Sequence, residues 1–209
     1  MSGEPTDTVP TEPAASASLR LGEDGLARCG WVGADPEYCR YHDEEWGRAL
    51  MGDRLLFEKL CLEGFQAGLS WITILRRRPA FRTAFHEFDV DRVAAMGEGD
   101  VARLLTDAGI IRHRGKIAAT ISNARVTRDL DTSLTELIWS FAPEPRATRL
   151  RHLGEVPAIT HESTALSREL RGRGYKFVGP TTMYALMQSA GLVDDHVSGC
   201  HRAADAPTG

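Results

Sequence analysis

The sequence lacks several features that would place the protein in a specialised class. No run of about 18 apolar residues occurs in its 209 residues, so we expect no membrane-spanning helix and no membrane partner. The N-terminus has no basic start followed by an apolar run, which argues against a secretory signal and favours a cytoplasmic protein. Four cysteines are too few for a disulfide scaffold in a chain of this length, and they favour reduced thiols or metal ligands.

The chain also lacks an excess of positive charge, because 25 basic residues face 29 acidic ones. The formal net charge of −4 comes from residues 1–24, where five acidic residues accompany Arg20 alone. The remaining 185 residues are neutral, with 24 charges of each sign. A neutral body does not exclude a nucleic-acid partner if its positive charges gather on one face.

The first 24 residues are rich in proline, threonine, serine, alanine and glutamate and contain no aromatic residue. Such a segment cannot bury enough apolar area to offset the entropy lost on ordering. We therefore expect a disordered acidic tail over residues 1–24 and a folded domain over residues 25–209, with a flexible C-terminal end. No sequence feature indicates an interface between copies, so we expect a monomer.

The folded part has the hydrophobic spacing of helices. From Asp53, a suitable N-cap, apolar residues follow at three- and four-residue spacing as far as Arg78, just before Pro79. Gly64 and Gly68 lie inside this run, and they predict either a break in the helix or the close approach of another segment. Because no stretch alternates over six residues, the predicted fold class is all-α. Further helices are expected at 89–96, 99–108, 113–128, 133–141, 162–172 and 181–190.

Two cysteine–histidine pairs lie at opposite ends of the expected domain. Cys29 and His42 lie near its start, and His196 and Cys200 lie near its end, four residues apart. A spacing of four allows both side chains to chelate one ion on a helical turn or tight loop. Two thiolates and two imidazoles suit a closed tetrahedral zinc site, which leaves no position for water and is therefore structural.

Spacing alone leaves the choice of ligands open. Cys39 precedes His42 by three residues, and His201 directly follows Cys200, so either could replace a neighbour. Cysteines and histidines at unrelated spacings are also often ordinary core or surface residues.

Residues 99–125 predict a helix, a short turn and a second helix. Gly109 can adopt the left-handed conformation that ends the first helix. The second helix then opens with free N–H groups beside Arg112, Arg114 and Lys116, and a helix N-terminus of this kind binds phosphate. The segment could grip the DNA backbone without reading sequence, or it could be a plain helical corner with solvated basic residues. Other basic residues that could share this face are Arg76, Arg77, Arg78, Arg82, Arg168, Arg171, Arg173 and Lys176.

Aromatic residues gather in the first third of the chain. Aromatic faces stack on a flat base and attract a flat cation, and a nearby carboxylate can accept hydrogen bonds from an exocyclic amine. Glu63 is the candidate carboxylate, because it lies mid-helix among apolar residues and needs a partner there. The alternatives are aromatic core packing and a core glutamate paired with arginine. The cluster consists of Trp31, Tyr38, Tyr41, Trp46 and Trp71.

Several blocks of the sequence together resemble the 3-methyladenine DNA glycosylase I family. The resemblance covers roughly residues 27–201 and suggests an all-α helix-hairpin-helix DNA glycosylase fold. The blocks are CGW at 29–31, YHDEEWG at 41–47, LEGFQAGLSW at 62–71, NAR at 123–125, FVGPT at 177–181 and DH at 195–196.

The resemblance implies an enzyme that hydrolyses the N-glycosidic bond of 3-methyladenine in alkylated double-stranded DNA and leaves an abasic site. It implies one structural Zn²⁺ held by Cys29, His42, His196 and Cys200. It also implies that the aromatic cluster lines a base pocket in which Glu63 is the catalytic residue and recognises the adenine edge. The DNA contacts that it implies are Leu69, as a wedge in the base stack, and Gly109, Ile111, Arg112, Arg114 and Lys116 in the hairpin.

The chain departs from the family pattern at Asp194, where members usually carry asparagine, and in its acidic N-terminal extension. Methylation at N3 makes adenine cationic, so the base leaves as a neutral molecule and needs little acid catalysis. Flipping the base and binding it well are therefore expected to supply the rate. We find no lysine beside the pocket motif, which predicts a monofunctional enzyme without a lyase step.

Two other functions compete with this interpretation. A non-enzymatic DNA-binding module would use the hairpin and the zinc only for structure, but it would need no aromatic pocket with a carboxylate. A zinc hydrolase of a small substrate would need an open metal position, which four protein ligands do not leave.

Overall fold

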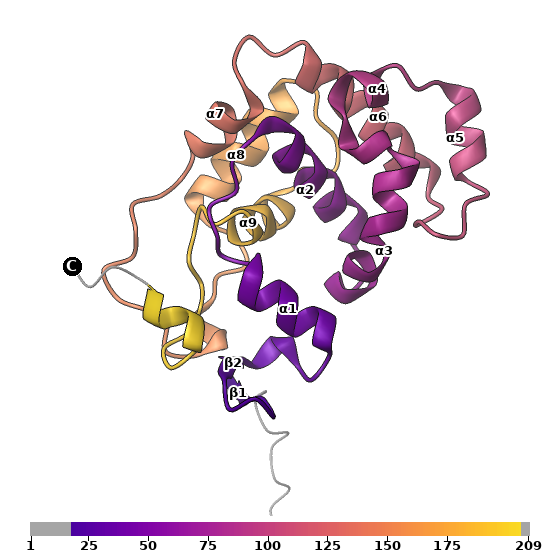
Figure 1. The fold of residues 1–209 in the computed structure, drawn as a ribbon. Helices are drawn as coiled ribbons and strands as arrows, with labels where there is room; N and C mark the ends of the chain where they lie inside the picture. Colours follow the sequence, from indigo (N-terminus) through magenta and orange to yellow (C-terminus); the bar gives the residue numbers. More distant parts are fainter. Residues whose placement is uncertain (1–17, 206–209) are drawn as a thin grey trace, which may run out of the picture.

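A buried helix, α2 (Asp53–Gln66), lies at the centre of the fold (Figure 1). In the computed structural model, which describes residues 18–205, residues 56–65 of α2 are all buried. Helices α3, α6, α7 and α9 pack against it, so that α2 has no solvent-facing side along this stretch. A helix covered in this way is normally apolar all round, yet α2 contains Glu58, Lys59 and Glu63. These three charges need partners inside the protein.

The remaining elements surround α2 in chain order. The N-terminal elements are β1 (Leu19–Leu21), β2 (Ala27–Cys29), η1 (Gly30–Val32) and α1 (Pro36–Glu44). After α2 come α3 (Trp71–Ala84), η2 (His86–Phe88), α4 (Val90–Ala94), α5 (Glu98–Leu104) and α6 (Arg114–Arg128). The last elements are α7 (Leu134–Trp139), η3 (Leu153–Glu155), α8 (His161–Gly172), α9 (Pro180–Ser189) and η4 (His201–Asp205).

The folded part begins earlier than the sequence predicts. Strand β1 pairs antiparallel with β2, with Arg20 opposite Arg28, so residues 18–24 are structured and the predicted boundary at residue 24 is wrong. The fold is mostly helical as predicted, but this two-stranded sheet corrects the all-α class. The rest of the predicted tail, residues 1–17, and the end of the chain, 206–209, lie outside the described residues. Within 18–205, no helix is long and apolar enough to cross a membrane.

The expected long helix over 53–78 is divided by a turn at residues 67–70. Gly68 has a φ of +86° there, a conformation that favours glycine, so the predicted break is confirmed. Gly64 makes the predicted close approach, because a Cβ at this position would lie 3.3 Å from Cβ of Phe177. The predicted end at Arg78 is wrong, since α3 continues through Pro79 to Ala84. Burial of Phe81 and Ala84 in the core outweighs the hydrogen bond that proline cannot make.

Helix α1 was not predicted. Asp35 accepts hydrogen bonds from the backbone N–H groups of Glu37 and Tyr38, and Pro36 occupies the first helical position. Both are standard signals for the start of a helix. The helix places Tyr38, Tyr41 and His42 on one short rigid element.

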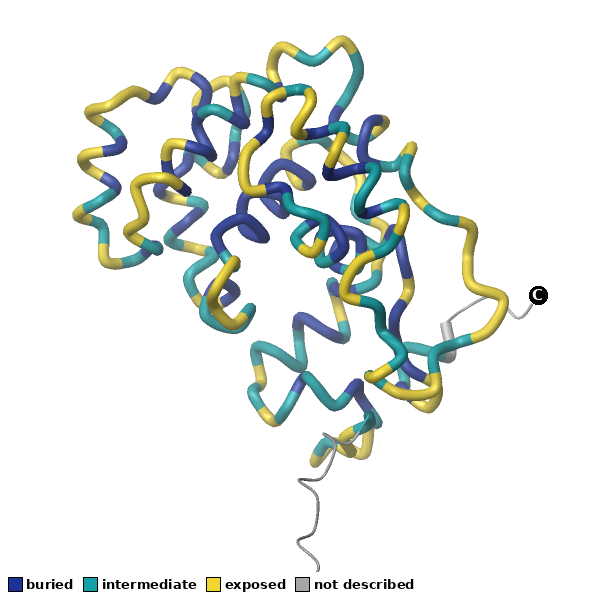
Figure 2. Tube along the Cα trace, turned by 180° about the vertical axis from the view of Figure 1, so that it is seen from behind, coloured by how far each residue is buried: buried dark blue, intermediate teal, exposed yellow. Residues whose placement is uncertain are grey.

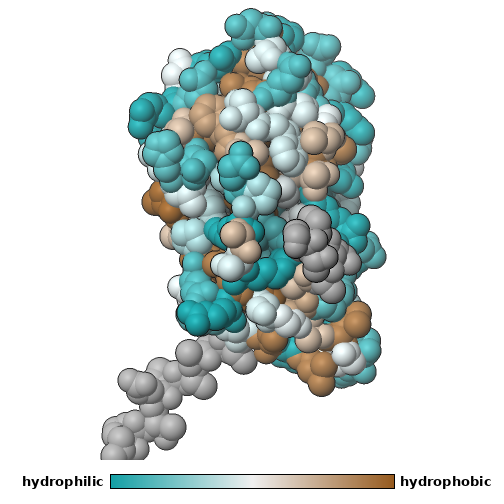
Figure 3. Space-filling model, turned by 90° about the vertical axis from the view of Figure 1, so that its left-hand side faces the viewer, coloured by the Kyte–Doolittle hydropathy of each residue, from teal (hydrophilic) through white to brown (hydrophobic). Residues whose placement is uncertain are grey.

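Two hydrophobic cores divide the molecule. The larger core is formed by α2 to α9, and a smaller one contains Cys29, Tyr41, Trp46 and Cys200 from the two ends of the chain. Trp71 packs against both. The N-terminal hairpin and the C-terminal segment lie together at one end of the molecule in Figure 1, and buried residues concentrate around α2 in Figure 2. On the face in Figure 3, hydrophobic residues form only small, separate groups.

Candidate active site

A cavity of about 200 Å³ lies where the two cores meet. It is smaller than the ~300–1,000 Å³ typical of sites for drug-sized ligands, and so suits one small ring system. The smaller core and Trp71 supply aromatic walls, and α2 and α9 supply polar groups. The lining residues are Trp31, Tyr38, Tyr41, Trp46, Glu63, Gln66, Trp71, Ala185, Gln188 and Ser189. The structure thus brings together all five predicted aromatic residues and the predicted carboxylate.

The aromatic walls support one another edge to face. The ring of Trp31 lies 5.0 Å from that of Tyr38 and 5.1 Å from that of Trp46, both in T-shaped contacts. On the other side, the rings of Tyr41 and Trp71 are 5.5 Å apart. These contacts fix the ring orientations and leave room between them for a flat ligand.

Glu63 presents a carboxylate oxygen to this cavity. Its Oε1 accepts a hydrogen bond from Oγ of Ser189 at 2.9 Å. No described residue bonds to Oε2, which is therefore available to a ligand. Burial raises the pKa of Glu63 to about 7, although the nearby Lys59 and the Ser189 hydrogen bond oppose this shift. Glu63 is thus poised between its charged and neutral forms near neutral pH, and a bound cation would favour the charged form.

A lysine does lie beside the pocket, which corrects the sequence analysis. Nζ of Lys59 is 5.0 Å from the ring centre of Tyr41, 5.7 Å from that of Trp71 and 4.0 Å from Oε2 of Glu45. Burial lowers the pKa of Lys59, and the nearby carboxylates partly offset this effect. Lys59 is not among the cavity-lining residues, and its amine lies over the rings of Tyr41 and Trp71, which do line the cavity.

Sequence reasoning missed the residues that α9 contributes. Ser189 holds Glu63, and Gln188 donates from Nε2 to Oδ2 of Asp195 at 2.8 Å, which fixes the glutamine side chain at the cavity wall. Asp195 is buried and also accepts from the hydroxyl of Tyr184 at 2.6 Å. These residues lie more than 120 positions after Glu63, and only the packing of α9 on α2 brings them to the site.

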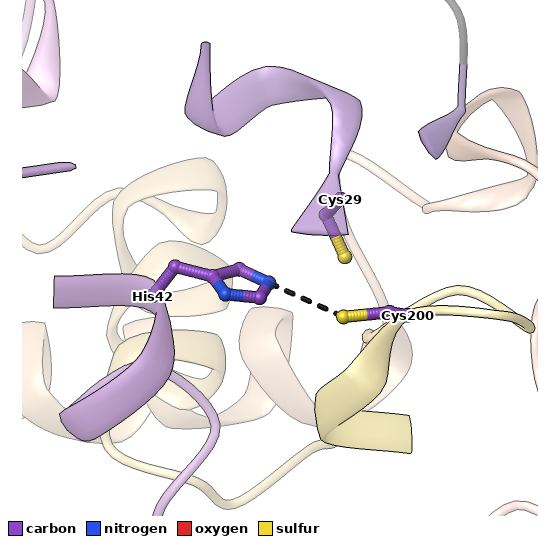
Figure 4. Close-up of side chains that lie close together, drawn as sticks. All are labelled: Cys29, His42 and Cys200. Carbon is purple, nitrogen blue, oxygen red and sulfur yellow. Dashed lines mark hydrogen bonds between the residues drawn. The ribbon is translucent and has the colours of Figure 1, made fainter. Parts of the chain in front are cut away.

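The second predicted site brings the two ends of the chain together. Cys29 at the end of β2, His42 on α1 and Cys200 before η4 point toward one another (Figure 4). Their ligand atoms all lie within 4.8 Å of one another, and Nε2 of His42 is 3.4 Å from Sγ of Cys200. The thiols form no disulfide. The hydrogen bond with Cys29 lowers the pKa of the Cys200 thiol, and the His42 ring adds to the effect.

His196 lies beside this group, and one of its two ring nitrogens has no hydrogen-bond partner. Its ring centre is 4.9 Å from that of His42, and its Nε2 is buried without a hydrogen-bond partner. Its Nδ1 lies 2.8 Å from Oδ1 of Asp194, so that Nε2 is left free to bind an ion. A buried imidazole nitrogen without a partner, next to two thiols and a second imidazole, fits the donor set of a zinc ion.

One carboxylate, that of Asp43, contacts both His42 and His201. Oδ1 of Asp43 lies 2.8 Å from Nδ1 of His42 and 2.8 Å from Nε2 of His201, and Arg28 holds the same carboxylate. His201 is thus engaged by Asp43. Cys39 lies instead 4.0 Å from the carbonyl of Gly33. A carboxylate on the far nitrogen is the usual support of a metal-binding histidine.

The group formed by Cys29, His42, His196 and Cys200 shares a wall with the cavity. The ring of Trp46 contacts that of His196 at 4.6 Å, and the ring of Trp31 contacts that of His42 at 5.5 Å. Both tryptophans also line the cavity. A shift of His42 or His196 would therefore move the tryptophan rings that line the cavity.

The predicted order of a helix, a connection and a second helix is confirmed, but several details differ. Helices α5 and α6 are joined by residues 105–113, but α5 ends at Leu104, and Gly109 is not among the glycines with positive φ. Gly109 is required instead for packing, because a Cβ there would lie 2.9 Å from Cβ of Ala80. Ile111 is partly buried against the larger core.

Lys116 does not face solvent, contrary to the prediction of a DNA contact. Its Nζ donates to the carbonyls of Phe65 at 2.8 Å and Ala67 at 2.7 Å. Lys116 therefore caps the C-terminus of α2, because the last carbonyls of a helix have no partner within it. The side chains of Arg112 and Arg114 are exposed, and Arg114 pairs with Glu98 at 2.9 Å.

Many of the other basic residues are engaged in ion pairs. Arg78 binds Glu45, Arg82 binds Glu58 and Arg173 binds Glu169. These ion pairs neutralise part of the positive charge that we expected on a DNA-binding face. Leu69, the predicted wedge, is 39% exposed in the turn between α2 and α3.

The geometry defines a mostly helical protein with an aromatic cavity that carries one buried carboxylate. The methyladenine glycosylase family model matches residues 31–203, so the chain belongs to this family.

Individual relatives agree over most of the chain. It is 52% identical over 179 residues to DNA-3-methyladenine glycosylase 1 of Escherichia coli (strain K12), covering 84% of this chain and 96% of that protein. A crystal structure of 3-methyladenine DNA glycosylase I matches with a TM-score of 0.80 and 51% identity, covering 83% of this chain and 98% of that one. The Staphylococcus aureus enzyme, solved to explain 3-methyladenine recognition, matches at 0.77 and 35% identity, covering 80% and 91%.

Proposed function

We propose that this protein is a DNA repair glycosylase that hydrolyses the N-glycosidic bond of 3-methyladenine in alkylated double-stranded DNA. The observation that carries the proposal is the aromatic cavity into which the free Oε2 of the buried Glu63 opens. Aromatic faces and a carboxylate both favour a flat cation, and N3-methylated adenine is one.

Recognition and catalysis rest on the same groups. The aromatic walls stack on the base, and the Glu63 carboxylate accepts a hydrogen bond from its exocyclic amine. Water adds to C1′ of the sugar as the C1′–N bond breaks. The bonding electrons stay on the departing base, and the proton from the attacking water passes to bulk solvent. Since the cationic base becomes neutral as it leaves, no protonated acid is required. Glu63 is the one carboxylate among the described residues that line the cavity, so a second carboxylate that could activate the water is missing from this lining. The rate therefore comes from flipping the base, holding it and binding the departing neutral base.

The base must leave the DNA duplex to enter the cavity. Leu69 projects from the turn at Gly68, where an exposed apolar side chain can fill the gap in the base stack. The first turn of α6 offers the backbone N–H groups of Arg114 and Gly115 to phosphate beside the exposed Arg112. The next N–H, that of Lys116, already donates to the side chain of His113. We assign α5 and α6 as a helix-hairpin-helix element on this basis.

We further propose that Cys29, His42, His196 and Cys200 hold one structural Zn²⁺. Bound zinc would supply a four-coordinate link between the start and the end of the domain. The four side chains come from β2, α1 and the C-terminal segment, and the two histidines contact the rings of Trp31 and Trp46. A closed set of four ligands also disfavours a zinc hydrolase.

The monofunctional character of the enzyme remains part of the proposal despite Lys59. A lyase step needs an amine that reaches C1′ of the sugar. The Lys59 amine lies over the rings of Tyr41 and Trp71 and 4.0 Å from Oε2 of Glu45, and Lys59 does not line the cavity. Its role is to hold Glu63 in its charged form.

The pH dependence of 3-methyladenine release tests the proposed function. Glu63 ionises with a pKa of about 7, so kcat/KM is expected to fall as the pH decreases through this value and the carboxylate becomes neutral. The groups that face Glu63 are Lys59, Tyr38 and Tyr41, and both tyrosines stay neutral there because burial raises their pKa values.

The variant Ser189→Ala sharpens this test. Loss of the hydrogen bond to Glu63 is expected to raise the pKa of the carboxylate and to move the midpoint of the profile to higher pH. A profile that is flat across pH 7 in the wild-type protein, or an unmoved midpoint in the variant, would contradict the role of Glu63.

The zinc proposal predicts an effect of Asp43 on metal affinity. Asp43→Asn weakens the support of His42 Nδ1, so the affinity for zinc is expected to fall about 10–100-fold in competition with a chelator. Glu44→Gln is the matched control, since Glu44 is exposed and pairs only with Arg40. Equal zinc affinity in both variants would reject the role of Asp43.

A further inference from the structure

The segment between α8 and α9, residues 173–179, contains a strained aromatic residue that the proposed function does not use. Phe177 has a φ of +59°, which is costly for a bulky side chain. Its side chain is also unusually accessible for a phenylalanine, with 41% of the residue exposed. Phe88 has a similar φ of +55° but is fully buried in the larger core. Burial in the core offsets the strain at Phe88, whereas Phe177 is far less buried.

Buried side chains hold the backbone on both sides of Phe177. Asn123 accepts from the N–H of Lys176 at 2.9 Å and donates to its carbonyl at 3.1 Å. Ser167 donates to the carbonyl of Val178 at 2.6 Å. These contacts fix the flanking residues and force Phe177 into its conformation. Strain that is maintained in this way is typical of functional positions.

The ring of Phe177 lies next to the start of α6. Its Cζ is 3.9 Å from the position of a Cβ on Gly115, and its ring centre is 6.4 Å from that of His113. Cβ of Phe177 also covers Gly64 on α2. The absence of a side chain at Gly64 allows this close approach of Cβ of Phe177, whereas the distance at Gly115 is an ordinary van der Waals contact.

Phe177 therefore lies close to both segments assigned to DNA. Lys116, next to Gly115, bonds to the carbonyls of Phe65 and Ala67, which ties the first turn of α6 to the turn that carries Leu69. Lys176, beside Phe177, is exposed and has no ion-pair partner among the described residues. Phe177 thus lies at the start of α6, next in sequence to an exposed cation, and Lys116 connects the start of α6 to the turn that carries the exposed Leu69.

We infer that Phe177 is a second apolar contact to DNA, which packs on a nucleobase exposed when the duplex opens beside the cavity. The inference rests on the proposed function. An aromatic face stacks on any base, and the neighbouring lysine suits the phosphate backbone. Leu69 and Phe177 then contact the opened base stack from two adjacent segments of the protein.

The variant Phe177→Gly separates this role from a structural one. Glycine adopts the positive φ without strain, so the melting temperature is expected to stay the same or to rise. Affinity for free 3-methyladenine, followed by tryptophan fluorescence, is expected to be unchanged because Phe177 does not line the cavity. The kcat/KM for base release from methylated duplex DNA is expected to fall about tenfold. Phe177→Trp keeps an aromatic face and is expected to retain most of the activity.

The control is Ile159→Ala, which removes another exposed apolar side chain and is expected to leave all three measurements unchanged. Wild-type rates of base release by Phe177→Gly would overturn the inference and leave the proposed function intact. Loss of melting temperature and of free-base affinity in parallel with activity would also overturn it, because Phe177 would then be structural. Absence of base release by the wild-type protein would refute the proposed function, and the inference with it.

Discussion

Replacement of Glu63 by glutamine is expected to reduce the release of 3-methyladenine on the order of a hundredfold, the scale seen when one electrostatic contact is removed from a buried site. Glutamine keeps the size of the side chain and can still bond to Ser189, but it carries no charge for the cationic base. The pH dependence of the remaining activity near 7 is expected to disappear, because the titrating group is gone.

Glu58→Gln is the matched control for this experiment. Glu58 is buried on the same helix, but it pairs with Arg82 and does not line the cavity. Its replacement is expected to leave kcat/KM unchanged even if the melting temperature falls. Full activity in Glu63→Gln, with normal folding and zinc content, would refute the assignment of Glu63.

Cys200→Ala is expected to remove the zinc ion and to lower the free energy of unfolding by several kcal/mol. The binding energy of a structural zinc contributes directly to folding. Cys200 is buried beside Cys29 and His42, so no solvent molecule can readily replace its thiolate. Base release is expected to fall as well, because His42 and His196 support Trp31 and Trp46 in the cavity wall.

Cys39→Ala provides the comparison. Cys39 is also on α1, but it does not belong to the group formed by Cys29, His42 and Cys200. Metal analysis and thermal unfolding of the two variants are the measurements. Unchanged metal content and an unchanged melting temperature in Cys200→Ala would reject the zinc site.

Most of the helices could be predicted because their apolar residues repeat at helical spacing over three or more turns. Helix α1 was missed although Asp35 and Pro36 mark its start, because its aromatic residues and charges hide any apolar stripe. The β1–β2 hairpin has strands of three residues, too short for alternation to be visible. Pro79 inside α3 shows tertiary burial overriding a local signal.

The aromatic walls and the carboxylate of the cavity could be predicted, because these residues lie close together in the sequence. Five aromatic residues lie close together before and after Glu63, and they remain together in the structure. Ser189 and Gln188 carry no signal of their own, because only the packing of α9 on α2 brings them there. The sequence could not show that the Lys116 amine bonds to the last carbonyls of α2, and so it predicts a DNA contact there instead.

The most direct test of the account is to incubate the protein with methylated duplex DNA and to identify the released bases by chromatography. We predict release of 3-methyladenine with little 7-methylguanine, since the cavity of about 200 Å³ and the single carboxylate suit one kind of base. No released base, from folded protein shown to contain one zinc ion, would contradict the account and favour a non-enzymatic DNA-binding module.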